Sequence, residues 1–155
     1  MANAGTELRA LWVIGHRVTP IPVGDRVAAL EVVTPAGIPG PPPHHHEDAS
    51  EFFFVTAGRL GVMMDGEWTS IGPGGYAEVP RGVVHTFRNE AEEDLRVITG
   101  FDPTGFEGFF EEFGIDASEP GAFEASLSDE SIRRVVEGCH RFGMILAPEV
   151  AAGRP

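Results

Sequence analysis

The sequence has no lysine: its 11 basic residues are all arginine, against 24 acidic residues, and the formal net charge is −13. Without lysine the chain cannot use a Schiff-base lysine, the lysine of a phosphate-binding loop or a lysine general base. The acidic balance, with a pI near 4.7, also gives no basic patch for nucleic acid or for an anionic bilayer. We therefore expect no nucleic-acid partner and no membrane partner.

Cysteine and long apolar runs are scarce as well. Cys139 is the single cysteine, so the chain has no internal disulfide and no cysteine-based zinc site of its own. The longest apolar run near the start, Leu11–Ile14, is too short for a signal peptide, and no stretch approaches the ~20 apolar residues of a membrane span. We therefore expect a cytoplasmic protein.

Glycine and proline are plentiful, at 20 and 13 of 155 residues, and their spacing divides the chain into three zones. Residues 1–16 form a lead-in, whose segment Leu8–Ile14 suits a short helix or an edge strand. Residues 17–114 contain short apolar or alternating runs between Gly and Pro, typical of an all-β sandwich or barrel, followed by a capping helix. Residues 115–155 form a C-terminal helical extension.

Eight strands are expected in the middle zone: Arg26–Thr34, Pro43–Glu47, Glu51–Ala57, Arg59–Met64, Glu67–Ile71, Tyr76–Val79, His85–Asn89 and Leu95–Phe101. Asp65-Gly66 is a strong signal for a two-residue hairpin turn between two of them. Five prolines within residues 35–43 predict an extended segment with few ladder hydrogen bonds.

Beyond residue 103 the apolar spacing changes to that of a helix. Thr104 and Glu107 suit a capping box, and four phenylalanines follow on one face: Phe106, Phe109, Phe110 and Phe113. A second helix is expected from Ser128 to Gly143, with an apolar face made of Ile132, Val135, Val136, Cys139 and Phe142. Both faces indicate packing, against the β core or against a second subunit.

Four of the six histidines fall in two places of the chain. In an extended strand alternate residues share a face, so His44 and His46 point one way and His45 the other. Glu51 follows a spacer that must contain a turn or bulge, and His85 starts a strand after a Pro-x-Gly turn. Three imidazoles and one carboxylate from different strands could hold a divalent first-row metal and leave positions open for catalysis.

The spacing of these residues resembles the two sequence motifs of the cupin superfamily. The first string runs from Pro43 through the histidines and Glu51 to Gly58. The second runs from Gly74 through Pro80-Arg81-Gly82 and His85 to Asn89. The leading glycine of the first motif falls on Ile38, which is the one departure. Within the superfamily, the chain is similar to small single-domain bacterial cupins described as quercetin dioxygenase-like.

This resemblance implies an all-β fold, the double-stranded β-helix or jelly-roll cupin barrel, with a short C-terminal helical extension. It implies one divalent transition metal per chain, chosen among Fe, Ni, Mn, Cu, Co and Zn. The ligands that it implies are His44, His46, Glu51 and His85. It also implies a homodimer that pairs through β-sheets, for which Phe52 and Phe54 offer an apolar outward face.

Strand parity predicts the substrate pocket next to these ligands. Phe53 and Phe87 share a face with ligand residues, so we expect them to line a cavity. Met64 and Tyr76 are further pocket candidates, with packing in the core as the alternative. His16 and His140 have no partner at a recognisable spacing, and no role is assigned to them.

Three functions are compatible with these residues. The resemblance favours a metal-dependent dioxygenase that acts with dioxygen on a small hydroxy-keto, flavonol-like or phenolic substrate. In that reaction Glu51 is expected to be the general base. One alternative is a non-oxidative isomerase or cyclase of secondary metabolism that uses the same residues. The other is a small-molecule-binding cupin without turnover.

Overall fold

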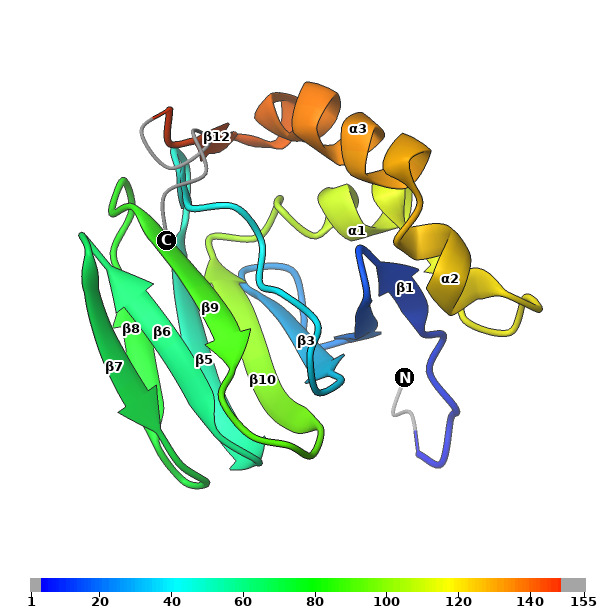
Figure 1. The fold of residues 1–155 in the computed structure, drawn as a ribbon, viewed down its shortest axis with the longest axis horizontal. Coiled ribbons are helices and arrows are strands. Elements are labelled where there is room, and N and C mark those ends of the chain that lie inside the picture. The colour runs from blue at the N-terminus through cyan, green and yellow to red at the C-terminus, as the bar shows by residue number, and fades with distance from the viewer. Residues whose placement is uncertain (1–3, 149–155) are drawn as a thin grey trace.

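Two antiparallel sheets packed against each other form the body of the protein in the computed structural model, which describes residues 4–148 (Figure 1). The larger sheet has seven strands, in the order β11 (Ile115–Asp116), β1 (Leu11–Val13), β2 (His16–Ile21), β3 (Ala28–Thr34), β10 (Leu95–Asp102), β5 (Ser50–Ala57) and β8 (Tyr76–Val79). The smaller sheet has five, in the order β12 (Met144–Leu146), β4 (His44–His46), β9 (His85–Asn89), β6 (Leu60–Met64) and β7 (Glu67–Ile71).

Alternation along the strands builds the core between the sheets. On β5, Glu51, Phe53 and Val55 are buried, whereas Phe54 and Thr56 are exposed. This period of two places one face of each strand inside the barrel and the other outside. The predicted all-β fold with a C-terminal helical extension is confirmed.

The eight strands expected between residues 26 and 101 are all present, and each boundary lies within two residues of its expected position. The hairpin between β6 and β7 turns at Asp65 and Gly66, where φ is 48° and 88°. Two residues of positive φ define the hairpin turn that the Asp-Gly pair predicts.

Three strands within residues 4–148 were not predicted, namely β2, β11 and β12, and their pairing joins the three zones that the sequence suggested. β1 in the lead-in pairs with β2 and with β11, so the lead-in is part of the larger sheet. Of the two alternatives for Leu8–Ile14, a strand is the observed one, but it is not an edge strand, because β11 pairs with it on the side away from β2. β12 in the C-terminal extension pairs with β4 and completes the smaller sheet.

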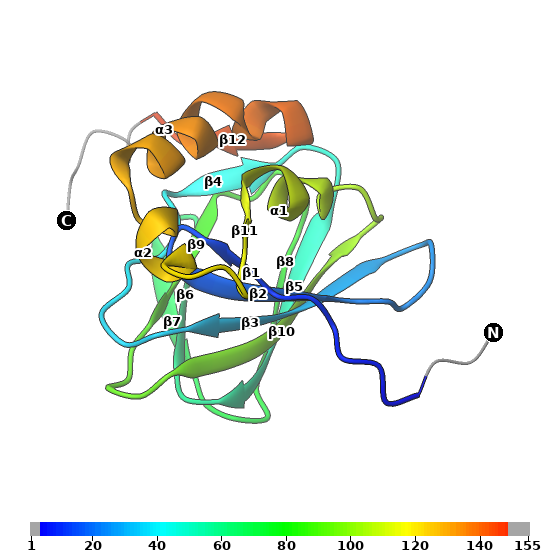
Figure 2. The same cartoon turned by 90° about the vertical axis from the view of Figure 1, so that its right-hand side faces the viewer.

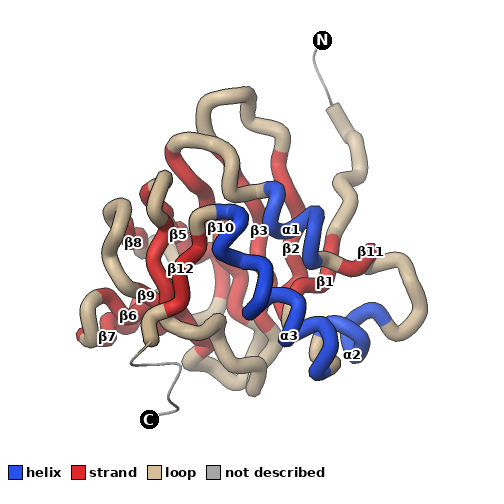
Figure 3. Tube along the Cα trace, turned by 90° about the horizontal axis from the view of Figure 1, so that it is seen from above, coloured by secondary structure: helices blue, strands red, loops and turns tan. Residues whose placement is uncertain are grey.

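Three helices follow the last long strand: α1 (Gly108–Phe113), α2 (Ala122–Ser126) and α3 (Asp129–Gly138), which continues into a 3-10 turn at Cys139–Phe142. Figure 2 and Figure 3 show them together at one end of the sheets, beside β12. None of the helices within residues 4–148 is long and apolar enough to cross a membrane.

The helix predictions are right in part. The backbone N–H of Ser131 donates to the Ser128 side chain at the start of α3, and Gly143 ends the helical segment with a φ of 76°, as expected. The apolar face of α3 packs only partly, because Val135 is buried while Ile132 and Val136 are exposed.

The start of α1 also differs from its prediction. Thr104 contacts the carboxylate of Glu107 with its hydroxyl and caps no backbone N–H, so the helix begins four residues later. The short α2, within the expected linker 116–127, was not predicted.

Candidate metal centre

The four side chains that the sequence singles out meet inside the barrel. His44 and His46 lie on β4, Glu51 lies on β5 and His85 begins β9. Each offers one potential ligand atom, and these four atoms lie within 4.8 Å of one another. All four residues are buried, with 5%, 5%, 6% and 1% of their surface exposed. The two sheets therefore supply three imidazoles and one carboxylate to one place.

Strand pairing explains how the distant His85 reaches the histidine run. His44 lies directly opposite His85 in the β4–β9 pair, and their ring centroids are 4.4 Å apart. Before β9 the chain turns at Gly82, whose φ is 81°, and the Gly82 N–H donates to His46 O over 3.0 Å. Glycine suits this turn because it adopts a positive φ without steric cost. The turn thus ties the start of β9 to the end of β4.

Backbone carbonyls orient two of the imidazoles. His44 Nδ1 lies 2.7 Å from Pro42 O, and His85 Nδ1 lies 2.9 Å from Val83 O. A carbonyl oxygen only accepts, so Nδ1 carries the hydrogen in both rings. Nε2 is then the atom that faces the centre of the cluster, as in imidazoles that bind metals with an outer hydrogen bond.

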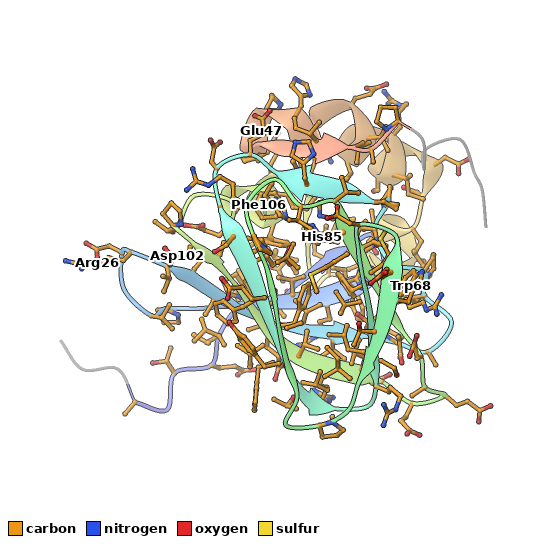
Figure 4. The ribbon with its side chains drawn as sticks, turned by 90° about the vertical axis from the view of Figure 1, so that its left-hand side faces the viewer. Arg26, Glu47, Trp68, His85, Asp102 and Phe106 are labelled. Carbon is orange, nitrogen blue, oxygen red and sulfur yellow. The ribbon has the colours of Figure 1, made fainter. Side chains whose placement is uncertain are left out.

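Aromatic rings, rather than a backbone group, surround the third imidazole. His46 Nδ1 is buried and has no hydrogen-bond partner among the described residues. Its ring lies 4.4 Å from the ring of Phe106 and 5.2 Å from that of Phe101, measured between centroids. In Figure 4, His85 and Phe106 lie toward the same end of the barrel, beneath the helices. Packing therefore positions His46.

Glu51 is the acceptor that the histidines share. Its Oε2 lies 2.8 Å from His85 Nε2 and 3.1 Å from His46 Nε2, and its Oε1 lies 3.2 Å from the hydroxyl oxygen of Thr99. Burial alone would raise the pKa of this carboxyl, but the hydrogen bonds from both imidazoles hold the pKa of Glu51 far below its usual value. The side chain is therefore an anion at neutral pH.

The surroundings of His85 fit a cation. Both ring nitrogens face an acceptor, Val83 O and Glu51 Oε2, yet a neutral imidazole has only one N–H. Although burial opposes it, the contact with Glu51 raises the pKa of His85, so a second proton can occupy Nε2. A metal ion would satisfy the same nitrogen and oxygen atoms by coordination. Three imidazole nitrogens with one carboxylate are a donor set for first-row transition metals.

The cluster borders a partly open cavity of about 70 Å³. Its polar lining residues are His16, His44, His46, Glu51 and Thr99, and no arginine is among them. The aromatic lining residues are Phe53, Phe87, Phe101, Phe106, Phe109 and Phe110. An apolar lining with a few converging polar groups is typical of a site for a small organic molecule.

Of the four predicted pocket residues, two line the cavity and two do not. Phe53 and Phe87 line the cavity. Met64 packs at the edge of the core and is not among the lining residues. The pocket prediction for Tyr76 is wrong: this residue is 59% exposed, because it lies directly opposite Phe54, which faces outward.

Several cavity residues were not predicted. Phe106, Phe109 and Phe110 were assigned to helix packing, and Met144 lies on the missed strand β12. His16 also lines the cavity, although no role was assigned to it. The run of phenylalanines was a visible signal, but the sequence does not reveal that this face closes over the ligand residues.

Comparison with known proteins agrees with this geometry. Residues 30–101, which include all four candidate ligands, match the family model described as "Cupin domain". No match to a curated protein is found. Among solved structures, KdgF from Halomonas sp. is 26% identical, with a TM-score of 0.54, over 58% of this chain and 80% of that chain.

Two further structures share the fold. An RmlC-like cupin from Shewanella frigidimarina is 19% identical with a TM-score of 0.57, over 66% of this chain and 89% of that one. A sugar phosphate isomerase from a cupin superfamily, from Silicibacter pomeroyi, is 22% identical with a TM-score of 0.53, over 59% of this chain and 61% of that one. At these identities the likeness concerns the fold alone.

Proposed function

We propose that this chain, whose residues 30–101 match the cupin domain model, is a cupin and a metal-dependent enzyme for a small, largely apolar substrate. One observation carries the proposal: a buried cluster of three histidines and one glutamate borders an aromatic cavity. His44, His46, Glu51 and His85 would hold one divalent transition metal. When bound, such a metal acts as a Lewis acid that favours the deprotonated form of a coordinated substrate oxygen.

As the specific reaction we propose dioxygenation of a hydroxy-keto, flavonol-like or phenolic compound. Six phenylalanines in the lining suit a flat, apolar body, and no arginine of residues 4–148 lines the cavity, which does not suit a phosphorylated sugar. Glu51 would accept the proton of the substrate hydroxyl, since it is the one carboxylate that the described residues contribute to the lining. Thr99 would keep the carboxylate in position through Oε1. Dioxygen is the second substrate of this reaction.

A non-oxidative isomerase or cyclase is the second candidate. The same observation supports it, because a buried carboxylate beside a metal site can also move a proton between two positions of one substrate. The two candidates differ in a single requirement, which is dioxygen.

The test compares reactions with and without oxygen. Untagged protein would be loaded separately with Fe²⁺, Mn²⁺, Co²⁺, Ni²⁺, Cu²⁺ or Zn²⁺ and given a panel of flavonols and catechols. Oxygen uptake that matches substrate loss supports the dioxygenase. Product formation under anaerobic conditions supports the isomerase or cyclase instead. Saturable binding without any product would contradict both enzyme proposals and leave a binding protein.

The role of Glu51 has its own test. Glu51→Gln keeps the size of the side chain but cannot accept a proton, so we expect kcat to fall on the order of 10²- to 10⁴-fold. Metal content, measured by elemental analysis, must be matched between the two proteins before rates are compared. A variant that carries the metal and retains full kcat would contradict the role of Glu51 as general base.

A further inference from the structure

His16 carries a buried polar atom without a partner. The residue is 5% exposed, and its Nδ1 lies 2.8 Å from the hydroxyl oxygen of Thr34. Its Nε2 is buried and forms no hydrogen bond of good geometry within residues 4–148, although the Pro39 carbonyl lies near the ring. A buried polar group left unpaired is unfavourable, because it has lost its hydrogen bonds to water without replacement. An atom of this kind in a cavity wall is a candidate contact for a ligand.

The ring of His16 lies one layer away from the metal centre. Phe87 follows His85 by two residues on β9, and Phe53 follows Glu51 by two residues on β5. Two residues of a strand span about 7 Å, so both phenylalanines lie about that far along the barrel from the candidate metal ligands. The ring centroids of His16 and Phe87 are 5.4 Å apart, and those of Phe53 and Phe87 are 5.6 Å apart. His16 therefore borders the cavity at the level of this phenylalanine layer.

The chemistry of His16 limits what it could bind. Burial lowers the pKa of this imidazole to about 4, although the nearby carbonyl of Pro39 opposes the shift. The ring is thus neutral at pH 7 and suits a neutral group better than a carboxylate or phosphate. Because the Thr34 hydroxyl can donate to Nδ1 or accept from it, Nε2 can be either acceptor or donor. A hydroxyl would satisfy Nε2 in either state, and a carbonyl would satisfy it when Nε2 carries the hydrogen.

We propose that His16 Nε2 binds a second polar group of the substrate, a neutral hydroxyl or carbonyl. This group would lie about 7 Å along the barrel from the substrate group that faces the metal ligands. The inference rests on the proposed function, because it places both contacts in the same cavity. It adds a substrate class: a flat apolar body with polar groups at two separate positions. His16 is then a residue that selects the substrate and sets its position.

Two substitutions separate the two ring nitrogens. In His16→Asn the side-chain amide can replace Nδ1 and its contact with Thr34 but cannot reach the position of Nε2. In His16→Gln the longer amide can reach the position of Nε2. The probes are phenol and toluene, which have almost the same shape and differ in one hydroxyl. Binding to the chelator-treated full chain would be measured by NMR titration, with the spectra also reporting that each variant is folded.

The readout is the ratio of the toluene Kd to the phenol Kd. We expect His16→Asn to lower this ratio about fivefold relative to the wild type, and His16→Gln to retain most of it. An equal ratio in all three proteins, or no binding of either probe, would overturn the proposal. Because the measurement needs neither metal nor turnover, its result is independent of whether the proposed enzyme activity is found.

Discussion

At the scale of single residues, the contacts of the metal centre converge on Glu51. Its carboxylate touches His46 and His85 with one oxygen and the Thr99 hydroxyl with the other. The cluster thus combines a buried anion with imidazoles whose Nε2 atoms face it. Removal of one imidazole leaves this anion with fewer partners, so the ligand residues depend on one another.

His85→Ala is expected to reduce bound metal from about one equivalent to a small fraction, because it removes one of four donors in a buried site. The matched control is His45→Ala, on the same run of histidines but with its side chain on the opposite face of β4. Elemental analysis of untagged proteins, together with circular dichroism, checks both metal content and fold. Full metal content in the His85 variant would contradict the proposed site.

The depressed pKa of His16 predicts a dependence of stability on pH. The folded state holds this imidazole neutral down to a pKa of about 4, whereas the unfolded chain has the ordinary value of 6.5. Between these values the unfolded state binds more protons, so the free energy of unfolding decreases as pH falls through this window. The contribution of His16 to this loss is about 3 kcal/mol.

Urea unfolding of the chelator-treated wild type and of His16→Asn at pH 7, 6, 5 and 4 measures this contribution. From pH 7 to pH 4, the wild type should lose about 3 kcal/mol more than the variant. All other titrating groups are common to both proteins and cancel in the comparison. Parallel pH profiles would show that His16 is not held neutral in the fold.

The residues of the site differ in how far the sequence could predict them. His44, His46, Glu51 and His85 have a spacing along the chain that identifies them as a group. His16 has no such spacing, because it reaches the cavity only through the pairing of β2 with β3. The face of Tyr76 depends on the register between β5 and β8, which the loop before β8 sets and the residue pattern does not reveal.

At the scale of elements, the strand that carries two ligands depends on the C-terminal segment. β4 is three residues long, and only one residue pair joins it to β9. On its other side, β12 pairs with all three of its residues, from Met144 opposite His46 to Leu146 opposite His44. The C-terminal extension therefore positions ligand residues as well as lining the cavity through Met144.

Ile145→Pro tests this dependence. Flanking bonds from Glu47 N–H to Gly143 O and from Ala147 N–H to Pro43 O indicate that the central pair, Ile145 and His45, is also hydrogen-bonded. Proline removes that donor, so we expect at least tenfold weaker metal binding in a competition titration against a chelator. Ile145→Val keeps the donor and serves as the control. Equal metal affinity in both variants would show that β12 does not position β4.

The elements themselves show what a sequence pattern can and cannot predict. β7, β8 and β9 match their expected bounds because alternating residues lie between clear turn signals. β11 and β12 have two and three residues, which is too short for a period of two to be visible. Their existence depends on partners more than ninety residues away in sequence, namely β1 and β4.

At the scale of the whole molecule, the outer face of the larger sheet is the surface that the expected homodimer would use. Phe54 on β5 and Tyr76 on β8 lie opposite each other and are 41% and 59% exposed. The ring of Phe52 stacks near that of Tyr76, with centroids 6.4 Å apart. Aromatic residues side by side on an outer sheet face are unusual for a surface in contact with water. The homodimer remains a prediction.

Charge supplies the sharpest test of that dimer. Each chain has a formal net charge of −13, so two copies repel each other, and an apolar contact between them must overcome this repulsion. Added salt screens the repulsion and leaves the apolar contact in place, so the dimer should become tighter between about 0.05 and 0.5 M NaCl. Light scattering at several protein concentrations measures this shift.

The double variant Phe54→Ser with Tyr76→Ser should be monomeric, whereas Trp68→Ser, at an exposed position of the other sheet, should dimerise as the wild type does. A monomeric wild type at every salt concentration would contradict the dimer, and an unchanged dimer in the double variant would place the interface elsewhere.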